Sequence, residues 1–248
     1  MNKKAQITIF IILAIAVVAA VGIYFAVSGN LDKVKGSSLD TRQIKSFVES
    51  CVEEAGEDAI YSISQKGGYL FSPNMSTFSG IPYYFYEGEN YMISKPELEK
   101  EISKYMNAEI YLCTNEFENF PNFKIKEGRI NTSVEILEDS VEFSVEYPLT
   151  ISKENSSVEL ENFEARISSG LGIVYNSIYE IIKDQMNYDS ICMSCIMNIA
   201  EEKDVYVGMK EGVDGDVIFT ITEKNIGLDR KDFEFVFANK YNFENEEE

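Results

Sequence analysis

The amino-acid sequence predicts an α+β fold in which a single N-terminal transmembrane helix precedes an extracytoplasmic domain of helices packed on antiparallel sheet. An uncharged apolar run near the start is long enough to cross a bilayer. Further along, apolar side chains at three- and four-residue spacing predict amphipathic helices, and alternating apolar and polar side chains predict half-buried antiparallel strands. Helices and strands come in separate runs, which is typical of the α+β class.

The apolar run covers residues 7–27 and contains no charged side chain. At about 1.5 Å per residue, a helix of this length spans about 30 Å, the thickness of a bilayer core. A cleaved secretory signal peptide is the alternative, but its apolar region is shorter. Lys3 and Lys4 precede the run and favour a cytoplasmic N-terminus. Residues 1–28 are therefore predicted to be a cytoplasmic lysine tail and a transmembrane helix, with the lipid bilayer as the partner of residues 7–27.

A short polar linker, residues 29–40, follows the predicted membrane helix. Residues 41–243 are predicted to form one α+β domain outside the cytoplasm, with residues 41–120 as a helical subdomain in an alternative division. Residues 244–248 form an acidic tail. The predicted helices are 41–65, a second that begins after Ser94 and includes Cys113, and 169–188; the predicted strands are 81–86, 90–93, 133–137, 141–147, 158–160, 205–207, 217–221 and 233–237.

The composition excludes some kinds of chemistry. The chain has no histidine, which excludes a Ser-His-Asp triad and a histidine-based zinc site. Its formal net charge is −20, from 42 acidic and 22 basic residues, and the basic residues are dispersed. Such a surface repels a phosphate backbone, so no nucleic-acid partner is predicted. The charge is typical of a highly soluble domain, and a basic protein partner is the alternative explanation.

Four cysteines follow the apolar run, and an even number favours disulfides, although three pairings are open. Cys51 and Cys113 lie on the apolar faces of two predicted helices and can pair if those helices are antiparallel; buried free thiols are the alternative. Cys192 and Cys195 form a Cys-X-X-Cys motif, for which a structural disulfide is the leading interpretation and thiol-disulfide exchange or a metal half-site are the alternatives. A zinc site with four cysteine ligands usually has two such motifs, and the chain has one. Apart from Cys192 and Cys195 as redox candidates, the sequence predicts no catalytic residue, no cofactor and no metal.

Three further motifs have both a functional and a structural interpretation. Asp214-Gly215-Asp216 resembles part of a calcium loop, but the full series of oxygen ligands is missing, so a turn between strands is favoured. The aromatic run at residues 83–86 is either a binding surface or the two faces of one strand, and the strand is favoured. Three sequons make glycosylation candidates of Asn74, Asn131 and Asn155.

Residues Lys3-Lys4-Ala5-Gln6, followed at once by Ile7-Thr8-Ile9-Phe10, resemble the class III prepilin-type signal of archaeal surface proteins. The resemblance implies cleavage between Ala5 and Gln6, after which the apolar stretch remains as an assembly helix. Such signals usually carry a glutamate at the fifth residue after the cleavage site, where this chain has Phe10. The remaining layout is similar to uncharacterised archaeal single-pass surface proteins, for which no activity is established. The shared features are a lysine-flanked anchor, an early helical cysteine, a central hairpin ending Tyr147-Pro148-Leu149-Thr150, a late Cys-X-X-Cys motif and a terminal Phe235-Val236-Phe237-Ala238-Asn239.

The leading functional hypothesis is a membrane-anchored, surface-displayed structural or interaction protein of the envelope, which binds protein partners or assembles with itself in a pilin-like manner. The alternative is an envelope thiol-disulfide exchange protein that uses Cys192 and Cys195. The reduction potential of that pair distinguishes the two. A hydrolase is a third class and requires a concave site with a carboxylate of raised pKa.

Overall fold

The computed structural model describes residues 40–188, 190–223 and 233–241, which form an α+β domain with four α-helices and nine strands. The predicted α+β class is therefore confirmed for these residues. The predicted transmembrane helix within residues 7–27, the prepilin-type signal and the acidic tail 244–248 lie outside the described residues. Within the described ranges, every helix is too short or too polar to span a bilayer.

The first sheet is built around a long antiparallel hairpin. β5 (Ser140–Lys153) pairs with β6 (Ser156–Ser168) along its length. On its other edge, β5 pairs first with β4 (Asn131–Ile136) and then with β3 (Lys124–Glu127). The two strands predicted around the 138–139 turn are confirmed. The strand predicted at 158–160 is part of the longer strand β6. Its full length was not predicted, because many positions of β6 carry polar side chains and the alternation of apolar and polar residues is hard to see.

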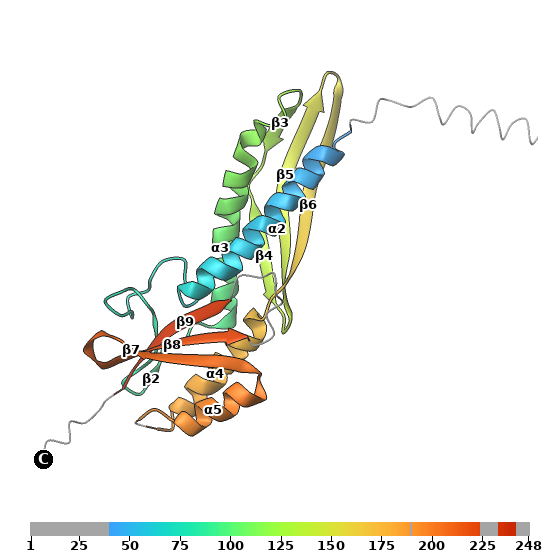
Figure 1. Cartoon of the computed structure of the whole chain (residues 1–248). Coiled ribbons are helices and arrows are strands. Elements are labelled where there is room, and N and C mark those ends of the chain that lie inside the picture. The colour runs from blue at the N-terminus through green and yellow to red at the C-terminus, as the bar shows by residue number, and fades with distance from the viewer. Residues whose placement is uncertain (1–39, 189, 224–232, 242–248) are drawn as a thin grey trace, which may run out of the picture.

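Two helices cover one face of this sheet (Figure 1). α2 (Arg42–Gln65) contacts β6, and α3 (Lys95–Thr114) contacts β4. The faces predicted from apolar spacing are the faces that the structure buries. The fully enclosed side chains include Ile44, Val48, Cys51, Val52, Ala59 and Ile63 from α2 and Leu98, Ile102, Met106 and Ile110 from α3.

The ends of both helices follow from local sequence. α2 stops where Gly67 and Gly68 adopt left-handed conformations with φ of 62° and 85°, which glycine adopts at little cost. The N–H of Gly68 thereby donates to the carbonyl oxygen of Ile63 at 2.9 Å. α3 starts with a capping box, in which Ser94 and Glu97 satisfy each other's backbone N–H groups.

The second sheet has the strand order β2-β1-β9-β8-β7. β1 pairs antiparallel with β2 and parallel with β9, so the first strand of the described residues lies beside the last. The strands predicted at 81–86, 205–207, 217–221 and 233–237 are confirmed, whereas the one predicted at 90–93 is wrong in extent, because β2 ends at Asn90. The parallel pair was not predicted, because alternation within a strand does not report its partner. The bounds are β1 (Tyr83–Tyr86), β2 (Glu89–Asn90), β7 (Val205–Glu211), β8 (Asp216–Glu223) and β9 (Glu234–Lys240).

Stacked aromatic rings fill the centre of the second sheet. The ring of Tyr84 stacks on that of Phe237 with centroids 4.8 Å apart, and Phe237 stacks on Phe219 at 5.1 Å. All three side chains are fully buried. The aromatic run at residues 83–86 is therefore a core strand, which confirms the favoured interpretation over a binding surface.

Two further helices pack on the second sheet. α4 (Leu171–Gln185) lies within the predicted helix, whereas α5 (Met193–Glu202) was not predicted. α5 is short and buries only Ile196 and Ile199, so its apolar period is weak. α4 approaches the turn between β4 and β5 so closely that a Cβ atom on Gly172 would lie 1.9 Å from the carbonyl oxygen of Leu137.

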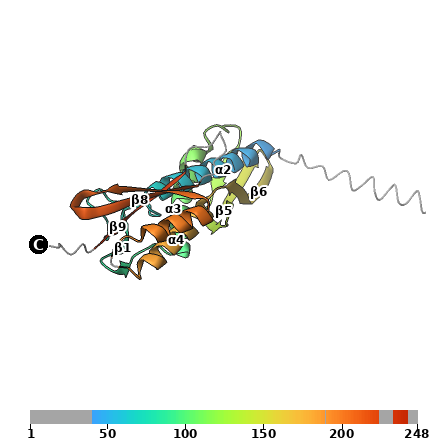
Figure 2. The same ribbon diagram turned by 60° about the horizontal axis from the view of Figure 1, so that its bottom comes forward.

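Both sheets and all four described helices contribute to one hydrophobic core. The helices within residues 41–120 share that core with the sheets, and α2 also contacts β9. Figures 1 and 2 show an elongated domain in which the start of α2 and the α4–α5 pair lie toward opposite ends. The two cysteine pairs therefore occupy different parts of the molecule.

Candidate functional site

The first cysteine pair links the two helices that cover the first sheet. Cys51 and Cys113 form a disulfide with their Cα atoms 5.7 Å apart. The pairing is possible because α2 and α3 run antiparallel, which places the first half of α2 beside the end of α3 (Figure 1). Cys51 is only 1% exposed. Cys113 is partly exposed. The burial of Cys51 and the position of the bond between two packed helices make it a structural crosslink.

The second pair, Cys192 and Cys195, forms a local disulfide at the start of α5. Cys192 is the N-cap residue, and the N–H of Cys195 donates to its Sγ atom at 3.4 Å. The Oγ atom of Ser194 lies 3.7 Å from the same sulfur. Both cysteines are partly exposed. A helix N-terminus and nearby donors stabilise a thiolate, so Cys192 is the better nucleophile of the pair once the bond is reduced.

The buried side chain of Gln185 holds the loop that leads to Cys192. Its Nε2 atom donates to the carbonyl oxygens of Tyr188 at 3.1 Å and Ser190 at 2.8 Å, and its Oε1 atom accepts from the N–H of Cys192 at 3.4 Å. The Tyr241 hydroxyl donates to the same oxygen at 3.4 Å, and burial raises the pKa of Tyr241 to about 12, so it remains a donor at neutral pH. Gln185 was missed in the sequence because a glutamine on a helix carries no signal of its partners.

Exposed apolar side chains lie around the Cys192–Cys195 disulfide. Met193, inside the motif, is 47% exposed, and Met197, one turn further along α5, is 65% exposed. Tyr188, in the turn before Cys192, is 50% exposed. Clustered exposed apolar side chains mark interaction surfaces, and methionine adapts to partners of different shape. We use the name α4–α5 patch for the exposed large apolar side chains of α4, α5 and the turn between them, which are Tyr179, Met186, Tyr188, Met193 and Met197.

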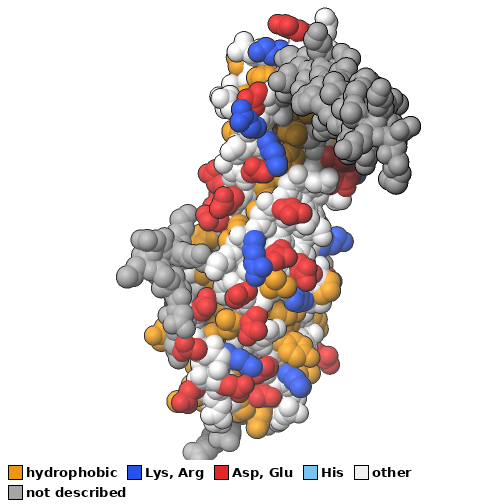
Figure 3. Space-filling view, turned by 90° about the vertical axis from the view of Figure 1, so that its right-hand side faces the viewer, with side chains coloured by type: hydrophobic (Ala, Val, Ile, Leu, Met, Phe, Trp, Pro, Cys, Tyr) orange, Lys and Arg blue, Asp and Glu red, His pale blue; other side chains and the backbone are white. Residues whose placement is uncertain are grey.

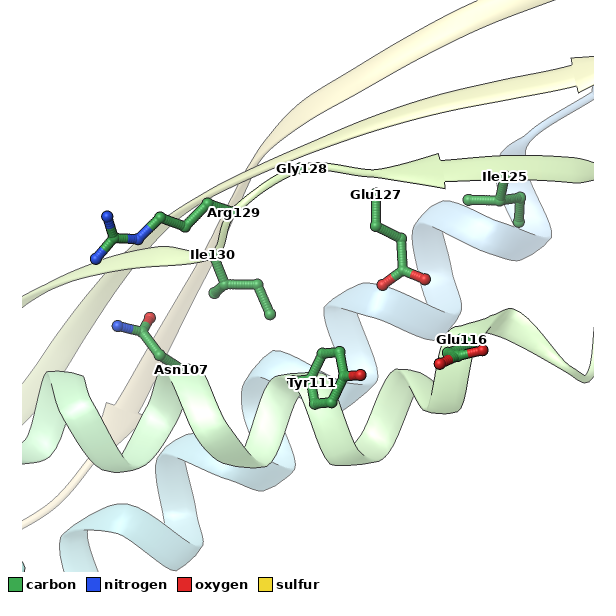
Figure 4. A pocket seen from close by; sticks show the side chains of 8 residues that line it. All are labelled: Asn107, Tyr111, Glu116, Ile125, Glu127, Gly128, Arg129 and Ile130. Carbon is green, nitrogen blue, oxygen red and sulfur yellow. The ribbon is translucent and has the colours of Figure 1, made fainter.

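A second candidate site is a groove of about 540 Å³ between α3 and the edge of the first sheet. Figure 4 shows Tyr111 of α3 and Glu127 of β3 projecting toward each other across it, with Glu116 beyond the end of α3. Carboxylates and a tyrosine ring are groups that bind cations. The lining residues are Asn107, Tyr111, Glu116, Ile125, Glu127, Gly128, Arg129 and Ile130.

Beside the groove, Tyr147 holds the Glu127 carboxylate in place. The Tyr147 hydroxyl donates a short hydrogen bond to Oε2 of Glu127 and lies 3.3 Å from the Oγ1 atom of Thr114. Burial, and then the hydrogen bond to Glu127, raise the pKa of Tyr147 far above its ordinary value. The phenol therefore stays protonated and orients the carboxylate. The groove was missed in the sequence, because it forms only when α3 docks beside the edge of β3.

The three glycosylation candidates are all exposed, in the loop after α2, at the start of β4 and in the β5–β6 turn. The second sequon differs from the others, because its Thr132 is only 5% exposed and donates to Oδ1 of Asn107 at 2.8 Å. That hydroxyl is therefore engaged in the folded domain. The candidates are Asn74, Asn131 and Asn155, whereas the processing candidates Ala5 and Gln6 lie outside the described residues.

The Asp214-Gly215-Asp216 segment is the turn between β7 and β8, as the sequence favoured. Asp216 is 4% exposed, accepts a hydrogen bond from the Tyr83 hydroxyl at 2.9 Å and lies 3.3 Å from the Lys240 ammonium group. The carboxylate therefore joins β8 to β1 and β9. Across the ranges that the structure describes, no three cysteine, aspartate or glutamate side chains are grouped to hold a metal ion.

Charged side chains are interspersed on the face shown in Figure 3, where basic groups sit singly among acidic ones. This distribution gives that face no basic stripe of the kind that follows a phosphate backbone. No protein-family model matches the chain, and no curated protein or solved structure matches it either.

Proposed function

We propose that the chain is a membrane-anchored, surface-displayed structural or interaction protein of the cell envelope. Residues 7–27 hold it in the bilayer, and the domain that follows lies outside the cytoplasm. The observation that carries this proposal is that both cysteine pairs are disulfide-bonded. Disulfides persist in oxidising compartments and are rare in the cytosol. The long uncharged run at the start of the sequence supplies the anchor.

Pilin-like assembly with further copies belongs to this proposal. Cleavage between Ala5 and Gln6 would leave the apolar run at the new N-terminus, free to pack against the same run of another copy. Any force between the membrane anchor and a domain displayed in this way acts on the domain at the start of α2. The Cys51–Cys113 bond ties α2 to α3, which suits that load. The groove beside Glu127 offers a surface for a protein partner with cationic side chains.

The test examines the full-length protein in its native membrane. We expect alkaline carbonate to leave the protein in the membrane fraction, because the apolar run is integral. After mild reduction of intact cells, a membrane-impermeant maleimide should label Cys192 and Cys195, and the Cys192→Ser/Cys195→Ser variant should lose this label. Labelling only after permeabilisation would contradict the outside location, and release by carbonate would contradict the anchor. Intact-mass measurement tests assembly: a chain that keeps residues 1–5 argues against the pilin-like state.

A second candidate function is thiol-disulfide exchange at Cys192 and Cys195. The specific observation in its favour is that Cys192 is the N-cap residue of α5 and that its Sγ atom accepts a hydrogen bond from the N–H of Cys195. The same hydrogen bond would stabilise a thiolate at Cys192. Gln185 holds the approach to this cysteine and so fixes the geometry of the motif. Partial exposure leaves both sulfurs within reach of an external thiol.

Redox titration of the full-length chain in detergent distinguishes an exchange site from a structural bond. We expect a reduction potential for Cys192–Cys195 between about −270 and −120 mV, the span of known exchange proteins. Cys51–Cys113 is the internal control and should lie below about −300 mV, because Cys51 is buried. Alkylation and peptide mass mapping at each potential report the two bonds separately. A value for Cys192–Cys195 below about −300 mV would leave that bond a structural one.

A further inference from the structure

The Cys192–Cys195 disulfide and the α4–α5 patch occupy the same end of the domain. Met193 lies between the two cysteines, Met197 follows one turn later, and Tyr188 precedes them in the turn from α4. Because the oxidising bond sits among exposed apolar side chains, a substrate can bury its own apolar groups while one of its thiols reaches the sulfur. A small thiol makes no such contact.

The acidic side chains around the patch favour basic substrates over acidic ones. Glu201 and Glu202 are exposed on α5, and Lys203 is held by both Glu180 and Glu202, at 3.0 and 3.3 Å. Lys203 is thus neutralised by its own partners. The other basic side chain of the two helices, Lys183, is exposed on α4 beside the patch, and it is outnumbered by the acidic side chains of α4 and α5, which are Glu180, Asp184, Glu201 and Glu202. The whole chain carries a net charge of −20, which adds to the attraction for a basic partner.

From this charge complementarity and the shared position, we infer that the α4–α5 patch docks an extended, basic polypeptide that contains two cysteines, and that the Cys192–Cys195 disulfide oxidises them. The inference rests on the exchange function proposed above and names its substrate class. The occupant is a polypeptide segment that exposes apolar side chains and thiols, as an envelope protein does before its own disulfides form.

The chemistry balances with the groups present. A substrate thiolate attacks Sγ of Cys192, a mixed disulfide forms, and the electron pair of the broken bond goes to Sγ of Cys195, which takes up a proton. The second substrate thiolate then attacks the substrate sulfur of the mixed disulfide. Cys192 leaves as a thiolate next to the N–H of Cys195. Two substrate thiols become one disulfide, and the disulfide of the protein becomes two thiols.

The experiment follows single-turnover oxidation of reduced peptides by the full-length disulfide form in detergent, with dithiothreitol as the small dithiol. One unstructured peptide carries lysine and phenylalanine beside its two cysteines, and a matched peptide carries glutamate and serine. We expect the basic peptide to react about tenfold faster than the acidic one, and the difference to shrink at high salt. Met193→Ser/Met197→Ser should lower the ratio of the basic-peptide rate to the dithiothreitol rate about tenfold, and Met197→Ser alone about threefold.

The matched control is Leu112→Ser on α3, which is 64% exposed and lies outside the patch. It should leave the ratio unchanged. Equal rates for the two peptides, or a ratio that Met197→Ser does not alter, would overturn the docking inference while exchange itself stands. If dithiothreitol cannot reduce Cys192–Cys195, the exchange function falls, and the docking inference falls with it.

Discussion

Replacing Phe237 by alanine is expected to lower the free energy of unfolding by about 3–5 kcal/mol. Phe237 is fully buried in β9 and stacks on Tyr84 from one strand and Phe219 from another, with centroids 4.8 and 5.1 Å away. Truncation removes both ring contacts and leaves a cavity that the two fixed rings can fill only in part. Urea unfolding of the full-length chain in detergent, followed by tyrosine fluorescence, measures the change.

Phe78→Ala is the matched control, because it removes the same atoms from a side chain that is 98% exposed. We expect it to change the free energy of unfolding by less than about 0.5 kcal/mol. A loss of less than about 1 kcal/mol for Phe237→Ala would mean that the aromatic stack contributes little to the stability of the second sheet.

The second large effect is expected from removing the disulfide between α2 and α3. Cys51 and Cys113 are 62 residues apart in sequence, and opening a loop of that length should destabilise the domain by about 4 kcal/mol. The reason is that the crosslink restricts the unfolded chain, which regains conformational entropy once the bond is lost. For a domain of this size, the apparent melting temperature of Cys51→Ala/Cys113→Ala should fall by about 8–16 °C.

Cys192→Ala/Cys195→Ala serves as the comparison, because its cysteines are 3 residues apart and the crosslink restricts little of the unfolded chain. We expect a loss below about 2 kcal/mol for this variant. A larger loss at Cys192 and Cys195 than at Cys51 and Cys113 would show that the local bond, and not the long-range one, is the main covalent support of the domain.

Most elements of the domain could be predicted because their buried faces repeat at a regular period. α2 buries Ile44, Val48 and Val52 at helical spacing, and β5 buries Val141 and Phe143 at strand spacing. α5 was not predictable in this way, because it turns few apolar side chains inward. Strand partners were not predictable either, since nothing in the sequence of β1 marks β9 as its neighbour.

Candidate sites made by residues close in sequence could be predicted, whereas those made by folding could not. Cys192 and Cys195 were recognisable because three-residue spacing is a local feature of the chain. The contact of Glu127 with Tyr147 depends on the register in which β3 opposes β5, where Glu127 faces Leu149. The α4–α5 patch could not be recognised from its methionines, because helical methionines are more often buried and only packing reveals their exposure.

The parallel pairing of β1 with β9 determines when the second sheet can form. β1 finds its neighbour in a segment that is translated near the end of the chain: the N–H of Ala238 donates to the carbonyl oxygen of Pro82, and the N–H of Glu87 donates to that of Lys240, at 2.9 and 3.0 Å. The first sheet and its two helices are complete in sequence by residue 168. During synthesis or export that half can fold on emergence, while β1 waits, unpaired on that side, for the last strand.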